Sequence, residues 1–180
     1  GANLQNGRSG AATTYFTAYD PEVETLLELK NPMSTEDNKI RGMDYNFGMN
    51  KTFARAAAQD KEIALFSYGS EPELYEAQYA KDQTLFSTLY EAYLADTTKP
   101  KKMVRARDLV ISSITEAYET GRSYLHFFDE FNIHTPFKDV IYESNLCSEH
   151  MAPTKGYDNM LDLYSTEDHG RGEISLCSLG

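Results

Sequence analysis

Cysteine is scarce in this chain of 180 residues, which contains only Cys147 and Cys177. Two cysteines far apart in the sequence do not make the disulfide framework of a small secreted domain. The sequence also has no CxxC pair and no Cys/His spacing typical of zinc sites. We therefore predict no metal ligands in this chain and a reducing, cytoplasmic setting in which both thiols are free.

Basic residues and long apolar runs are also few. Lys and Arg total 17 against 28 for Asp and Glu, which gives a net charge of -11. Nonspecific nucleic-acid binding needs clustered cations, so this balance argues against it, although a small nucleotide site needs only a few local donors. No apolar run approaches the roughly 18 residues of a membrane span. We expect neither nucleic acid nor a membrane as a partner, and the length fits one globular domain.

Strand-like and helix-like patterns alternate along the sequence. Strands are predicted over residues 11–19, 63–66, 123–128 and 173–179. Helices are predicted after Asp20-Pro21, in the second part of residues 39–60, after a capping box at residues 70–73, and over the stripes 85–94 and 106–117. Gly121 stands where a helix C-cap belongs. This alternation predicts an α/β fold with a largely parallel sheet.

Residues 143–149 contain the chemistry that the rest of the sequence lacks. Read as extended backbone, this stretch places Asn145, Cys147 and Glu149 on one face. They supply a hydrogen-bonding amide, a redox-capable sulfur and a candidate general base. On spacing alone, an inert buried cysteine beside surface polar residues is the more common alternative.

A second alternative concerns metal binding. His126, Asp129 and His134 lie close together in the sequence. Neither a histidine pair at helical i, i+4 spacing nor a further clear ligand accompanies them, so the sequence does not favour a metal site there.

Several motifs together resemble the large (alpha) subunit of class I ribonucleotide reductase, a ribonucleoside-diphosphate reductase. They are Asn-Leu-Cys-Ser-Glu (145–149), Thr-Gly-Arg-Ser-Tyr (120–124), Asn-Ile-His-Thr-Pro-Phe (132–137), Gly-Arg-Ser-Gly-Ala-Ala-Thr (7–13) and Glu-Ile-Ser-Leu-Cys (173–177). The resemblance covers the whole chain but only a middle portion of the family's protein. The sequence starts at Gly1 without Met and stops after an apolar strand-like run. We therefore expect a partial sequence or one piece of a split protein.

The resemblance implies part of a ten-stranded α/β barrel with the active-site loop running through its centre. Residues 1–180 would form a partial catalytic barrel domain, and residues 143–150 its active-site cysteine loop. Residues 1–13 resemble the substrate-specificity loop, which moves when an effector nucleotide binds. Gln5, Gly7 and Arg8 are the residues expected to act there.

The activity implied is the reduction of ribonucleoside diphosphates to deoxyribonucleoside diphosphates by a thiyl radical, for DNA precursor synthesis. Cys147 resembles the cysteine that carries the radical, and Glu149 the general base for the 3'-OH, with burial expected to raise its pKa. Asn145 would hold the sugar hydroxyls. Cys177 resembles one member of a pair of redox-active cysteines. The other member lies before Gly1 in the family, so a Cys147–Cys177 disulfide is not expected to be the catalytic pair.

The resemblance also implies partners. A metal-containing small (beta) subunit would supply the radical, thioredoxin or glutaredoxin the electrons, and ATP and dNTPs would act as allosteric effectors of a homodimer of the full alpha subunit. No cofactor is expected to bind directly to this chain, and the isolated chain is expected to be inactive. The alternative is a non-catalytic split or truncated piece that only assembles with other subunit fragments.

Overall fold

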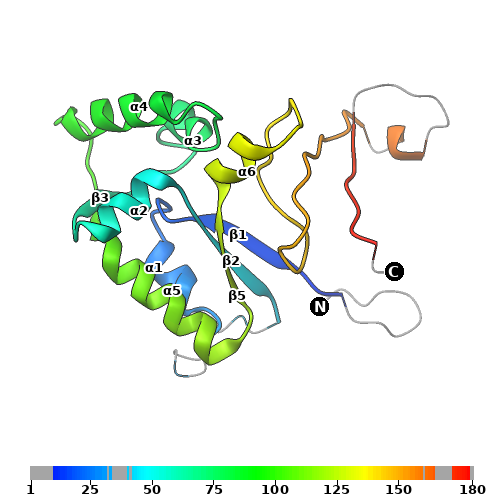
Figure 1. The fold of residues 1–180 in the computed structure, drawn as a ribbon, viewed down its shortest axis with the longest axis horizontal. Helices are drawn as coiled ribbons and strands as arrows, with labels where there is room; N and C mark the ends of the chain where they lie inside the picture. The colour runs from blue at the N-terminus through cyan, green and yellow to red at the C-terminus, as the bar shows by residue number, and fades with distance from the viewer. Residues whose placement is uncertain are drawn as a thin grey trace.

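A three-stranded parallel sheet organises the chain (Figure 1). The computed structural model describes residues 10–31, 33, 40, 42–159, 161–164 and 172–178. The sheet has the order β1-β2-β5, and both of its strand pairs are parallel. Its strands are β1 (Thr13–Thr17), β2 (Asp44–Met49) and β5 (Ser123–Phe127). The predicted α/β fold with a parallel sheet is confirmed.

Helices connect and cover these strands. They are α1 (Val23–Glu28), α2 (Lys51–Ala58), α3 (Pro72–Ala77), α4 (Gln83–Ala95), α5 (Ala106–Thr120), α6 (Phe128–His134) and the 3-10 turn η3 (Asp162–Tyr164). A short antiparallel pair joins β3 (Glu62–Ala64) to β4 (Met103–Arg105). Helix α5 ends at Thr120 and has Gly121 as its C-cap, as the sequence predicted, and Gly121 has a left-handed φ of 66°. In the part of the chain described, no helix is long and apolar enough to cross a membrane.

The two faces of the parallel sheet differ in polarity. On one face, Phe16 and Phe47 pack against each other, and Phe47 packs against Phe53 of α2, with ring centroids 5.8 Å apart in both pairs. Side chains alternate along a strand, so the residues between them point to the other face. That second face carries polar groups, among them Tyr15 and the fully buried Asn46. The sheet therefore has an apolar side for the helices and a polar side for another segment.

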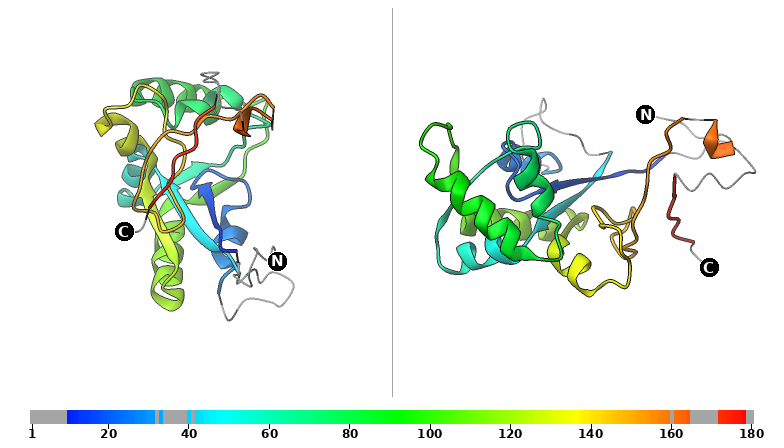
Figure 2. Two further views of the ribbon diagram at one scale, coloured as in Figure 1. Left: turned by 90° about the vertical axis from the view of Figure 1, so that its right-hand side faces the viewer. Right: turned by 90° about the horizontal axis from the view of Figure 1, so that it is seen from above.

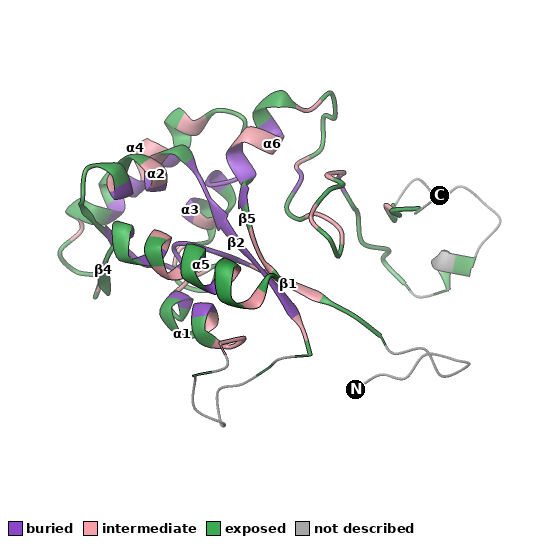
Figure 3. Cartoon of the chain, turned by 60° about the horizontal axis from the view of Figure 1, so that its bottom comes forward, coloured by how far each residue is buried: buried purple, intermediate pink, exposed green. Residues whose placement is uncertain are grey.

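The segment that follows α6 lies against the polar face. This segment is drawn yellow to orange in Figure 2, and two of its backbone carbonyls, those of Asn145 and Leu146, accept hydrogen bonds from β1 side chains. Much of this segment is exposed or only partly buried, whereas the middle of the sheet is buried (Figure 3). The fold thus presents residues 143–150 on an open side of the sheet.

Gly48 in β2 is required by the residue on the neighbouring strand. A Cβ atom at this position would lie 2.8 Å from Cε1 of His126 and 2.9 Å from Cδ1 of Phe128. Both distances are shorter than van der Waals contact. The bare backbone of Gly48 therefore leaves the space that the His126 ring occupies.

Two local predictions were wrong. The Ser70 capping box does not form: Pro72 is the first residue of α3, Glu71 is its N-cap, and no side chain caps the helix. The predicted strand over residues 173–179 is also absent from the described residues 172–178, where Glu173 makes one isolated bridge to Lys155. An apolar alternating pattern becomes a strand only when another strand pairs with it, and none of the described strands does so here.

Candidate active-site loop

Residues 145–148 form a tight turn, so the extended reading of this stretch was wrong. The Ser148 N–H donates to the Asn145 carbonyl oxygen at 3.1 Å, and Ser148 has a left-handed φ of 63°. The Asn145 side-chain oxygen accepts from the N–H groups of Glu149 at 3.0 Å and His150 at 2.9 Å. An asparagine side chain that bonds to the following backbone favours a turn over a strand. Asn145 therefore shapes the loop as well as belonging to it.

Three side chains of the sheet hold this turn. Thr13 Oγ1 donates to the Leu146 carbonyl at 2.6 Å, and the Tyr15 hydroxyl donates to the Asn145 carbonyl at 2.6 Å. Asn46 Nδ2 donates to Ser148 Oγ at 2.7 Å. All three anchors come from the polar face of β1 and β2. Sequence reasoning missed them, because Thr13, Thr14 and Tyr15 are consecutive polar-capable residues with no alternation that marks one strand face as polar.

Cys147 lies at the tip of the turn and is exposed. The alternative of an inert buried cysteine is therefore wrong in this structure. An exposed thiol on a loop whose backbone is tied to a sheet is accessible to a substrate, and its position is defined by the sheet.

Glu149 is exposed too, and the expectation that burial would raise its pKa was wrong. A hydrogen bond with the Asn145 side chain, and then one with the Cys177 thiol, lower the pKa of Glu149 below its usual value. Both interactions favour the ionised carboxylate, and they outweigh desolvation, which acts to raise the pKa but is a smaller effect at this exposed position. Glu149 is therefore ionised at neutral pH and able to accept a proton.

Cys177 is brought to the loop from the far end of the described chain. Its Sγ donates to Glu149 Oε1 at 3.3 Å. The Lys155–Glu173 bridge and a contact of 2.9 Å between His150 Nε2 and Ser175 Oγ hold the two segments together. The nearby Glu149 carboxylate raises the pKa of the Cys177 thiol. Asn145, Glu149 and Cys177 thus form one contact group beside Cys147, and both cysteines are free thiols.

His126 lies beneath the loop and is buried. Its Nδ1 is hydrogen-bonded to Asn46 Oδ1, and its ring stacks on Phe131 with centroids 5.3 Å apart. Burial lowers the pKa of His126 to about 4, so the imidazole is neutral at pH 7.

The three hypothetical metal ligands have separate roles. His126 bonds to Asn46, Asp129 accepts from the Lys51 N–H at 2.8 Å, and His134 pairs with Glu130 at 2.9 Å. Among the residues that the structure describes, no group of three His, Cys, Asp or Glu side chains is arranged to hold a metal ion.

The pKa of His126 predicts a loss of stability in acid. The unfolded chain binds a proton at its usual pKa near 6.5, whereas the folded chain binds it only near pH 4. The free energy of unfolding therefore falls as pH drops through this window, by about 2 kcal/mol between pH 7 and pH 4.5 from this group alone. Urea unfolding of a His126→Gln variant should show a correspondingly smaller difference between the two pH values. An equal difference in both proteins would contradict this assignment.

Comparison with known proteins identifies the fold. Residues 2–180 match the family model described as ribonucleotide reductase, barrel domain. The chain belongs to the ribonucleotide reductase family. It is 39% identical over 96% of its length to the ribonucleoside-diphosphate reductase subunit alpha of Haemophilus influenzae, and 40% identical over 96% to that of Enterobacteria phage T4. It is 40% identical over 82% of its length to the ribonucleoside-diphosphate reductase 1 subunit alpha of Escherichia coli.

The chain spans 20 to 22% of the length of these curated relatives. The sheet β1-β2-β5 is accordingly a part of a ribonucleotide reductase barrel domain, which agrees with the fold class predicted from the sequence. The predicted specificity-loop residues Gln5, Gly7 and Arg8 lie outside the described residues.

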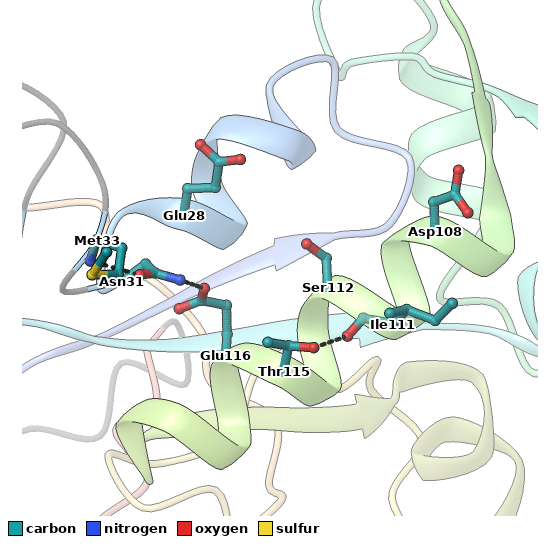
Figure 4. Close-up of a pocket in the computed structure, with 8 residues that line it drawn as sticks. All are labelled: Glu28, Asn31, Met33, Asp108, Ile111, Ser112, Thr115 and Glu116. Carbon is teal, nitrogen blue, oxygen red and sulfur yellow. Dashed lines mark hydrogen bonds between the residues drawn. The ribbon is translucent and has the colours of Figure 1, made fainter.

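A surface pocket of this ribonucleotide reductase segment lies on the helical side, between α1 and α5 (Figure 4). Its lining includes Glu28, Asn31 and Glu116, and Asn31 Nδ2 donates to the Glu116 carboxylate. None of the predicted site residues lines this pocket. The candidate site is therefore the exposed cysteine loop, which other parts of a complete barrel would have to enclose.

Proposed function

We propose that this chain supplies the radical-bearing cysteine loop of a catalytic subunit that reduces ribonucleoside diphosphates to deoxyribonucleoside diphosphates. The observation that carries the proposal is the contact group of Asn145, Glu149 and Cys177 beside exposed Cys147. The amide and carboxylate of the loop lie beside two free thiols, one on the loop and one on the segment that carries Cys177, in a family barrel domain. The alpha-subunit names of the relatives support the same activity.

The chemistry fits these residue types. Hydroxide is a poor leaving group on an unactivated carbon, and a radical at C3' weakens the neighbouring C2'–O bond. A Cys147 thiyl radical takes the hydrogen atom from C3' and becomes a thiol, while ionised Glu149 accepts the 3'-OH proton. The 2'-OH takes up a proton from one of two further thiols and leaves as water, and C2' receives a hydrogen atom from the other thiol. The electron then held by the resulting disulfide reduces C3', whose oxygen regains its proton from Glu149, and Cys147 returns its hydrogen atom to C3', which restores the thiyl radical.

The net reduction needs two electrons. Oxidation of two thiols to a disulfide supplies them, and Cys177 is one of these thiols in our proposal. Its raised pKa keeps Cys177 protonated at neutral pH, so that it can supply hydrogen to the sugar, and its hydrogen bond to Glu149 holds the thiol at the loop. Asn145, which also contacts Glu149, would orient the sugar hydroxyls.

The other parts of the proposal concern the complete enzyme. Residues 1–180 belong to its catalytic barrel domain, with residues 1–13 as the substrate-specificity loop and residues 143–150 as the active-site loop at the barrel's centre. A metal-containing beta subunit generates the radical, thioredoxin or glutaredoxin renews the dithiol, and ATP and dNTPs regulate a homodimer of alpha subunits in the cytoplasm. This role makes the protein an allosteric oxidoreductase of DNA precursor synthesis.

Reconstitution tests this function. The chain is mixed with the remaining segments of an alpha subunit, the beta subunit, an effector nucleotide and reductant, and dCDP formed from CDP is measured. We expect product only when this chain is present, so the matched control omits it. A complex that assembles with this chain but forms no dCDP would contradict the catalytic role and favour a non-catalytic assembly piece.

A further inference from the structure

The buried side-chain amide of Asn46 makes hydrogen bonds with both its oxygen and its nitrogen. It has no exposed surface, and it lies in β2 under the cysteine loop. Its Oδ1 bonds to Nδ1 of His126, and its Nδ2 donates to Ser148 Oγ at 2.7 Å. Since an amide oxygen only accepts, Nδ1 of His126 must donate. The histidine thereby fixes which end of the Asn46 amide faces the loop.

The ring of His126 is itself held on several sides. Phe131 stacks on it with an interplanar angle of 12°, and Tyr15 meets it edge-on with centroids 5.6 Å apart. The missing side chain of Gly48 provides the space beside it. His126 cannot turn away from Asn46 without disturbing these contacts, so the donor to Asn46 is pre-oriented.

The hydrogen bonds from His126 to Asn46 and from Asn46 to Ser148 reach the loop at Ser148. It directly follows Cys147, and its left-handed φ of 63° is uncommon for a residue with a side chain. The bond from Asn46 holds the Ser148 side chain in place and so favours this backbone conformation. The direction in which Cys147 leaves the turn depends on the conformation of the next residue.

We propose that His126, Asn46 and Ser148 form a positioning network that fixes the place of Cys147 over the sheet for hydrogen transfer. The inference rests on the proposed function, to which it adds three positioning residues that do not touch the substrate. The relevant principle is that hydrogen transfer needs its atoms in a narrow range of distance and direction, so a small displacement of the thiol lowers the rate.

Activity of the reconstituted enzyme separates this role from simple packing. We expect His126→Leu, which removes the donor, to lower kcat for dCDP formation about 10- to 100-fold, with KM for CDP changed less than about twofold. His126→Gln retains an N–H donor for Asn46 and should recover most of kcat. Phe131→Leu is the matched control, because it weakens the packing of the same ring but leaves the hydrogen bonds. Equal kcat values for the Leu and Gln variants would overturn the network.

Amide hydrogen exchange tests the network without activity. The N–H groups of Glu149 and His150 are held by Asn145 Oδ1 within the same turn. Ser148→Ala removes only a partly exposed hydroxyl, so the variant should fold. We expect faster exchange at both amides in Ser148→Ala and His126→Leu, and wild-type exchange in His126→Gln. Unchanged exchange in Ser148→Ala would overturn the network.

The two readouts also separate this inference from the proposed function. A wild-type complex without dCDP formation, combined with the expected changes in exchange, would refute the proposed function and support the network. An active wild-type complex, combined with identical exchange in all variants, would support the proposed function and refute the network.

Discussion

A Cys147→Ser variant is expected to lose dCDP formation by at least about a thousandfold, because no other group can replace a cysteine that forms the radical. A serine O–H bond is much stronger than a thiol S–H bond, so the radical cannot pass to the hydroxyl oxygen of the variant at a useful rate. Cys147 is exposed, and the change replaces only its sulfur atom, so the turn should persist. The measurement is dCDP formed per minute by the reconstituted enzyme.

Cys177→Ser makes the same atomic change at the neighbouring thiol and serves as the matched control. It should also stop multiple turnovers, because the second thiol of the reducing pair is lost. Radical transfer to Cys147 should survive, so the electron paramagnetic resonance signal of the beta subunit should decay when CDP is added. In Cys147→Ser that signal should stay constant. Retention of full activity by Cys147→Ser would defeat the radical assignment.

The parallel sheet was predictable from the sequence, whereas the shape of the loop was not. Alternating strand-like and helix-like patterns report local burial. Phe16 lies in a strand predicted in this way, and Gly121 is the expected C-cap, whereas the central strand β2, which contains Phe47, was not among the predicted strands. The turn at Asn145 depends on its side chain bonding to the backbone of Glu149 and His150. A polar stretch of that kind has no periodicity that separates a turn from a strand, so the extended reading failed.

The anchors of the loop were missed for a different reason. Tyr15 lies 130 positions from Asn145, and Asn46 lies 102 positions from Ser148. Only the order of the strands in the sheet brings them together. The lowered pKa of Glu149 was equally invisible in the sequence. Its causes are hydrogen bonds with Asn145 and with Cys177, a residue 28 positions away. The residue types that do chemistry were identifiable from the motif, but their electrostatic environment was a product of the fold.

Glu149→Gln should lower kcat about 10²- to 10⁴-fold, because it removes the group that accepts the 3'-OH proton and leaves the size of the side chain unchanged. In the wild-type protein, hydrogen bonds lower the pKa of Glu149, so the carboxylate stays ionised as pH falls to the usual glutamate value. The acid limb of the kcat/KM profile due to this group, which reports the free enzyme, should therefore lie below that value, and it should be absent from the residual activity of the variant. Glu173→Gln is the matched control, because Glu173 is an exposed carboxylate on the segment that carries Cys177.

The same Glu149→Gln substitution has a consequence that can be measured without turnover. The Glu149 carboxylate raises the pKa of the Cys177 thiol, so its removal should lower that pKa and increase the thiolate fraction at pH 8. Alkylation of Cys177 by iodoacetamide, followed by mass spectrometry of the peptide, should therefore be faster in Glu149→Gln than in the wild-type protein or in Glu173→Gln. If the alkylation rate does not change, the carboxylate and the thiol are not coupled, and the contact group beside Cys147 is wrong.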